Sequence, residues 1–102
     1  MYKLILSRAA EEDLEQIVSY MVNDLANPMA AQHFLDAVCD CYMNLKSMPK
    51  MYEESRDAYL RSLGYRKVVI GKYILLYRID ESETCVRIYR VFYGARNYKA
   101  FL

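Results

Sequence analysis

The chain has few of the residues that build metal centres. Its 102 residues include a single histidine, His33, and three cysteines. His33 has no second imidazole at the spacing of metal ligands, and neither a CxxC nor an HExxH pattern occurs. We therefore expect no metal centre and no cofactor.

Cysteine is also too sparse for a disulfide framework. Cys39 and Cys41 lie two residues apart in a helical pattern and would point to different sides, which leaves Cys85 without an obvious mate. Three reduced thiols are typical of the cytoplasm, where disulfides are rare.

Glycine, proline and long apolar runs are scarce as well. Three glycines, two prolines and the absence of repeats exclude collagen-like, solenoid and disordered chains. No apolar run approaches the ~20 residues that span a bilayer, and Ser7 and Arg8 end the N-terminal apolar stretch too early for a signal peptide. We expect a cytoplasmic protein without a membrane partner. Hydrophobic residues make up 55% of the chain, enough for residues 1–102 to form a single domain.

Charge is unevenly distributed along the chain. Residues 1–50 hold four Lys/Arg and seven Asp/Glu, a net charge of −3, whereas residues 51–102 hold ten and six, a net charge of +4. The folded chain can therefore present an acidic side and a basic side. Such a surface suits a polyanionic or an acidic partner.

Hydrophobic spacing predicts one strand, two helices and three further strands. Alternation marks the strands, and apolar residues at spacings of three and four mark the helices. The predicted strands cover 2–6, 65–70, 73–79 and 85–93, and the predicted helices cover 8–25 and 28–48. Segment 49–63 has no clean period and is expected to be a loop or a short helix.

Short connections decide how these elements pack. Asn27 and Pro28 supply a cap and a proline at the first helical position, so the second helix follows the first at once. Helices joined this closely should run antiparallel as a hairpin with a shared apolar seam. The sequence therefore predicts the α+β class, in the order β-α-α-β-β-β, with an antiparallel sheet and the helical hairpin packed on one face.

Cations and tyrosines are concentrated in residues 61–102. Nine Lys/Arg stand against three Asp/Glu there, and six of the eleven tyrosines fall in the same stretch. Cations interleaved with aromatic rings on a sheet can hold phosphates and stack bases. Tyrosine-rich strands with basic solvent faces are also common for packing and solubility alone. Both interpretations stay open at the level of composition.

Arg90 lies within the last predicted strand, where alternation places it on the same side as Val86, Ile88 and Phe92. An arginine in that position needs a partner. We predict a structural ion pair between Arg90 and a carboxylate of the first helix.

Three segments together resemble the RelE/ParE toxins of type II toxin–antitoxin systems. They are Gly64-Tyr65-Arg66-Lys67, Tyr73 to Arg78, and Arg90 to Tyr98. The resemblance covers nearly the whole chain. It implies an antitoxin partner with an acidic, partly disordered tail that folds over the toxin, in a toxin–antitoxin hetero-oligomer. It also implies growth arrest when the toxin is free.

The resemblance leaves two targets. In the RelE-like branch, which cleaves messenger RNA on the ribosome, Arg66, Arg96 and Tyr98 would be the catalytic residues. However, Val68 and Ile74 stand where that branch has cations.

These apolar residues favour the ParE-like branch, which inhibits DNA gyrase and is not known as a nuclease. The residues expected to contact the target or the antitoxin are Arg61, Arg66, Lys67, Tyr93, Arg96 and Lys99. The endoribonuclease is the alternative, so whether the chain is an enzyme stays open. A third hypothesis is a small RNA-binding α+β module that is not a toxin.

Overall fold

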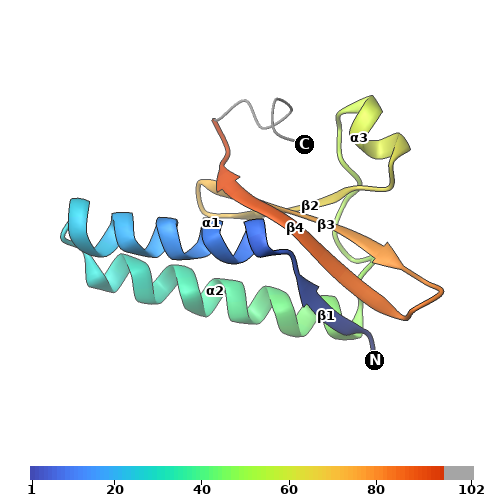
Figure 1. Ribbon diagram of the computed structural model, residues 1–102, viewed down its shortest axis with the longest axis horizontal. Coiled ribbons are helices and arrows are strands. Elements are labelled where there is room, and N and C mark those ends of the chain that lie inside the picture. Colours follow the sequence, from blue (N-terminus) through green and yellow to red (C-terminus); the bar gives the residue numbers. More distant parts are fainter. Residues whose placement is uncertain (96–102) are drawn as a thin grey trace.

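The computed structural model describes residues 1–95. Its elements, in chain order, are β1 (Lys3–Leu6), α1 (Arg8–Ser19), η1 (Tyr20–Asp24), α2 (Pro28–Ser47), α3 (Ala58–Ser62), β2 (Arg66–Ile70), β3 (Tyr73–Asp80) and β4 (Cys85–Tyr93). The long helices α1 and α2 follow β1 and precede β2, β3 and β4 of a four-stranded sheet (Figure 1), and the predicted α+β class is confirmed. Segment 49–63 is a loop that carries the short helix α3, as expected.

The sheet has the strand order β1-β4-β3-β2. Strands β2, β3 and β4 are antiparallel neighbours, but β1 pairs with β4 in parallel, from Lys3↔Cys85 to Leu6↔Ile88. The expectation of a purely antiparallel sheet was therefore wrong at this edge. Parallel neighbours need a long connection, and the helices and the β2–β3 hairpin provide it between β1 and β4.

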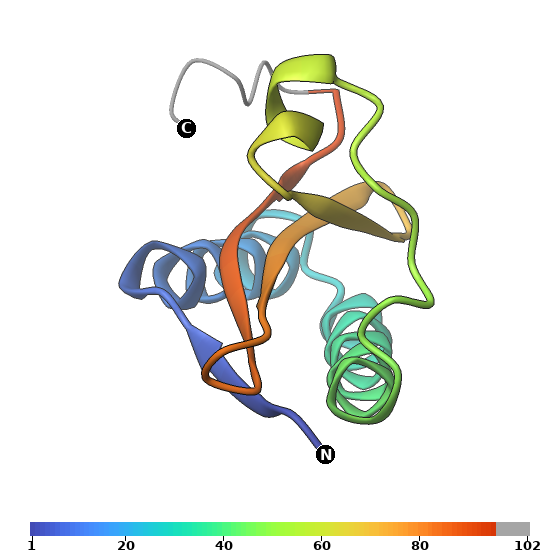
Figure 2. The same ribbon diagram turned by 90° about the vertical axis from the view of Figure 1, so that its right-hand side faces the viewer.

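The helical hairpin forms where the caps predict it. The Ser7 hydroxyl accepts the N–H of Ala10 at 3.0 Å, and the Asn27 side chain accepts the N–H of Ala30 at 3.1 Å. Figures 1 and 2 show α1 and α2 running antiparallel on one face of the sheet, with α3 on the opposite side. The first helix is not regular to its end, because its last turn, η1, is a π-helix. No helix within residues 1–95 is long and apolar enough to cross a membrane.

The main core lies between the helical hairpin and the sheet. Phe34, Val38 and Leu45 of α2 pack there with Leu75 and Tyr77 of β3, and all five are buried. The Tyr77 hydroxyl reaches the loop after α2 and donates a hydrogen bond to the Pro49 carbonyl. This bond gives the one polar atom of a fully buried ring a partner.

Strand β4 does not alternate regularly. Leu76 pairs with Arg90 but Tyr77 pairs with Ile88, so Tyr89 is an extra residue in β4, a β-bulge. Beyond the bulge, Val91 joins the helix-facing core with Val86 and Ile88, while buried Phe92 is not part of that core. Arg90 pairs with Leu76, on the side opposite to Leu75 and Tyr77, so the predicted grouping of Arg90 and Phe92 with Val86 and Ile88 was wrong.

Candidate functional site

The outer face of the sheet, away from the helical hairpin, carries an arginine enclosed by two tyrosines. The Arg78 guanidinium carbon lies 5.5 Å from the ring centre of Tyr65 and 6.0 Å from that of Tyr89. The two rings meet edge to face with their centres 5.4 Å apart. Arg87 lies directly opposite Arg78 on the neighbouring strand, and its guanidinium is 3.7 Å from Asp80. We call Tyr65, Arg78, Arg87 and Tyr89 the outer-face cluster.

Arg66 and Lys67 point to different sides of β2. Arg66 shares its side with the core residues Val68 and Ile70, and its guanidinium donates to the Tyr52 carbonyl at 2.8 Å and pairs with Glu54 at 3.7 Å. Lys67 alternates to the outer side and pairs with Glu53 at 3.8 Å. The structure thus separates these two predicted contact residues.

The position of Val68 in the core explains why this residue is apolar. The residue is 6% exposed and belongs to the helix-facing core. Its apolar side chain is therefore required by packing and is not a substitution on an active surface. Ile74 alternates to the outer side and packs near Gly94, so it does stand where a cation would be exposed.

Two of the remaining predicted contact residues, Arg61 and Tyr93, lie in the described part of the chain. Exposed Arg61 of α3 lines a shallow pocket with Arg66, Glu54 and Glu81. Tyr93, at the end of β4, is half exposed and packs edge to face on Tyr73 at 5.9 Å. The predictions for Arg96, Tyr98 and Lys99 concern residues outside the described part of the chain.

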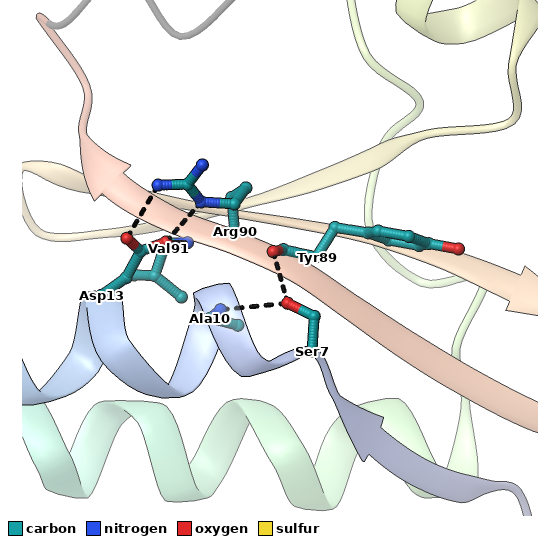
Figure 3. A network of polar contacts seen from close by, with 6 residues as sticks. All are labelled: Ser7, Ala10, Asp13, Tyr89, Arg90 and Val91. Atoms are coloured by element: carbon teal, nitrogen blue, oxygen red, sulfur yellow. Dashed lines mark hydrogen bonds and ion pairs between the residues drawn. The ribbon is translucent and has the colours of Figure 1, made fainter. Parts of the chain in front are cut away.

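An ion pair joins the first helix to β4 (Figure 3). Asp13 accepts hydrogen bonds from Nε of Arg90 at 2.8 Å and from Nη2 of Arg90 at 2.9 Å. The same carboxylate accepts the backbone N–H of Val91 at 3.0 Å. The pair predicted for Arg90 is therefore present, and these hydrogen bonds raise the pKa of Arg90.

Ser7 forms a hydrogen bond with the bulge residue Tyr89, beside this ion pair. Its hydroxyl donates to the Tyr89 carbonyl at 2.7 Å while it accepts the N–H of Ala10 (Figure 3). The parallel pairing of β1 with β4 ends at Ile88. Beyond it, the backbone of β4 is hydrogen-bonded by the side chains of Ser7, at Tyr89, and Asp13, at Val91. The end of the strand, at Phe92 and Tyr93, extends past both side chains.

A groove opens next to this strand end, between the first helix and the sheet. Its walls come from α1, η1, the start of β3 and the end of β4. They include Ile17, Tyr20, Leu25, Lys72, Tyr73 and Tyr93. Leu25 is 53% exposed and Tyr20 is 48% exposed, which is high for side chains of this kind. We call this the edge groove.

The sequence did not predict the edge groove. Hydrophobic spacing placed Leu25 at the end of the first predicted helix, whereas in the structure it follows the π-helical turn η1 and is 53% exposed. The position of Leu25 next to the Ala26-Asn27 connection was the one sequence feature that could have indicated an exposed leucine there.

Buried thiol and phenol groups are not poised for proton transfer at neutral pH. Burial raises the pKa of the Cys41 thiol to about 11 and that of Tyr42 to about 12. Burial also raises the pKa of Tyr77. Among the described residues, no group of three His, Cys, Asp or Glu side chains could hold a metal ion.

Several solved structures that resemble this chain come from toxin–antitoxin systems. A chain of the chromosomal ParDE system from P. aeruginosa superposes with a TM-score of 0.69 at 18% identity, covering 91% of this chain and 96% of that one. The RelBE2 toxin–antitoxin complex from Mycobacterium tuberculosis gives 0.64 at 26% identity, with coverages of 90% and 96%. A YoeB/ParE toxin from Agrobacterium tumefaciens gives 0.63 at 17% identity, with coverages of 89% and 96%.

The sequence itself gives the family. A family model described as the ParE toxin of the type II toxin–antitoxin system parDE matches residues 4–98. The chain therefore belongs to this family, and the resemblance to RelE/ParE toxins is confirmed. A comparison with curated proteins found no match.

Proposed function

We propose that this toxin arrests growth by binding and inhibiting DNA gyrase, without catalysing a reaction itself. The observation that carries the proposal is the match of the ParE toxin model over residues 4–98. Family membership favours a toxin over a small RNA-binding module. A gyrase inhibitor acts in the cytoplasm, which is where the proposal places the chain.

The geometry of Arg66 supports a non-catalytic toxin. A cation that stabilises a phosphorane must be free to meet the charge as it develops. Arg66 is instead held by the Tyr52 carbonyl and Glu54, on the helix-facing side of β2. Contact with a protein surface needs no such freedom.

Purified toxin tests the proposal directly. Added to gyrase and relaxed plasmid, it should block supercoiling and increase cleaved DNA. The control is toxin premixed with its antitoxin, which should restore supercoiling. Untouched supercoiling at large excess, together with cutting of ribosome-bound message, would show that the proposal is wrong.

A ribosome-dependent endoribonuclease is the second candidate. The observation that favours it is the outer-face cluster, where Arg78 stacks on two tyrosines as cations do on RNA-binding sheets. In this version Arg66, Arg96 and Tyr98 carry the reaction. A folded Arg96→Ala variant that is still fully toxic would argue against it.

The partner that we propose is an antitoxin with an acidic, partly disordered tail. Both the ParDE and the RelBE2 structures are toxin–antitoxin assemblies. The edge groove offers such a tail apolar walls and the exposed cation Lys72. An extended segment can place alternate side chains in such a groove. Binding there orders the tail in a toxin–antitoxin hetero-oligomer.

A further inference from the structure

Two arginines face each other across the middle of the sheet, and inhibition of gyrase does not account for them. Arg78 of β3 is in register with Arg87 of β4. Both alternate to the outer side, because Tyr77, Val86 and Ile88 belong to the helix-facing core. Side chains opposite each other on neighbouring strands lie about 5 Å apart at Cβ, where like charges lower stability.

The fold neutralises this pair only in part. Arg87 is 3.7 Å from Asp80, but both side chains are substantially exposed, so water and salt weaken the contact. No carboxylate within residues 1–95 forms a salt bridge with Arg78, which lies over the rings of Tyr65 and Tyr89 instead. Within the described residues, Arg78 therefore has no carboxylate that neutralises it through a salt bridge.

The geometry suits phosphate oxygens. A guanidinium stacked on an aromatic ring keeps its N–H edge available, and that edge donates two parallel hydrogen bonds to a phosphate. Two neighbouring guanidinium groups can hold one phosphate from two directions. The half-buried rings of Tyr65 and Tyr89 add aromatic surface beside them.

We propose that the outer-face cluster binds the phosphodiester backbone of a single-stranded nucleic acid. Arg78 and Arg87 hold the phosphate, and Tyr65 and Tyr89 contact the adjoining sugar or base. The cluster needs no catalysis and does not depend on which target the toxin inhibits. DNA and RNA share the phosphodiester that it recognises.

An acidic peptide fits the same place less well. Extended peptides gain most of their affinity from backbone hydrogen bonds to a strand edge. Here β3 lies between β2 and β4, and β4 is paired with β1 from Cys85 to Ile88, so no edge is free. Nucleic acids are held mainly by side chains on phosphates and bases, which is what this surface provides. Asp80 and Glu81 line the same depression, and their carboxylates repel a phosphate at that end of the site.

Binding of labelled oligonucleotides to the full-length toxin tests the proposal. Fluorescence anisotropy would be measured with a dT 12-mer and a U 12-mer over a range of salt concentrations. Arg78→Gln and Arg87→Gln should each weaken both complexes by about fivefold or more, and each should lower the salt slope by about 0.7. Arg8→Gln is the matched control, because Arg8 is an exposed arginine on α1 and its loss should leave binding unchanged.

A gain in binding provides the second arm. Asp80→Asn removes the carboxylate that competes for Arg87 and should strengthen binding about threefold or more. Equal affinities for the two oligonucleotides identify the phosphodiester itself as the ligand, and a preference for one identifies the source. Equal losses in Arg8→Gln and Arg78→Gln would overturn the proposal. Binding of polyglutamate at the same affinity would overturn it in favour of an acidic peptide.

Discussion

Asp13 on α1 holds Arg90 on β4 through both of its oxygens and also accepts the backbone N–H of Val91. One carboxylate therefore fixes the first helix against the edge of the sheet. It does so just beyond Ile88, where β1 stops pairing with β4. The contact lies beside the edge groove, which Asp13 and Val91 also line.

Replacing Asp13 should be costly. In Asp13→Ala, Arg90 loses this carboxylate in a site where its side chain is only 20% exposed, and the N–H of Val91 loses its acceptor. We expect the free energy of unfolding to fall by about 3 kcal/mol, measured by urea denaturation. The control Glu12→Ala, next to exposed Arg8, should change it by less than about 0.5 kcal/mol. Equal effects of the two substitutions would contradict the assigned role of Asp13.

Stability should fall as the pH rises from 9 towards 11. Burial raises the pKa of the Cys41 thiol from 9.0 to about 11. Between these values the unfolded thiol ionises while the folded thiol stays protonated, so ionisation favours the unfolded chain. Denaturation at pH 8, 9, 10 and 11 measures the slope. Cys41→Ala should reduce the slope mainly between pH 9 and 10, because Tyr42 and Tyr77, whose pKa values burial also raises, add to it above pH 10. Cys39→Ala, at an exposed position, should leave the slope unchanged. A slope unchanged by Cys41→Ala would show that this thiol does not cause it.

Much of the fold follows from the sequence because local signals there agree. The Ser7 and Asn27 caps and the helical spacing between them give the hairpin, and alternation gives the last three strands. The parallel pairing of β1 has no local signal, since it depends on how the sheet closes around a long connection. The predicted α+β class therefore holds while one strand direction does not.

The site was harder to predict because a shift of one residue along a strand moves a side chain to the opposite face of the sheet. Arg66 and Lys67 are adjacent and basic, and only the register of β2 shows that Arg66 faces the helices. The bulge at Tyr89 reverses the sides of the residues after it, yet no glycine marks it in the sequence. The ion pair of Arg90 was predictable because a half-buried arginine needs a carboxylate on whichever side it lies.

Gly64 should resist substitution for a backbone reason. Its φ of +87° lies in the left-handed region, between α3 and β2. Gly64→Ala should lower the free energy of unfolding by about 1–2 kcal/mol, while Gly64→Asn should cost less, because asparagine tolerates this conformation. Urea denaturation of both variants measures the difference. A cost for asparagine equal to that for alanine would place the cause in packing rather than in the backbone.

Antitoxin binding and toxicity should be separable at the edge groove. Leu25 is half exposed in its wall, so Leu25→Arg should fold normally while it blocks an apolar side chain of the antitoxin. We expect the affinity for the antitoxin encoded beside the toxin gene to fall by about tenfold or more, measured by calorimetry, and growth arrest by the variant alone to persist. Met29→Arg is the matched control, since Met29 is 69% exposed on α2 and does not line the groove. If both variants bind antitoxin as the unmodified chain does, the antitoxin docks elsewhere. If Leu25→Arg also loses toxicity while it remains folded, the groove contacts the target as well.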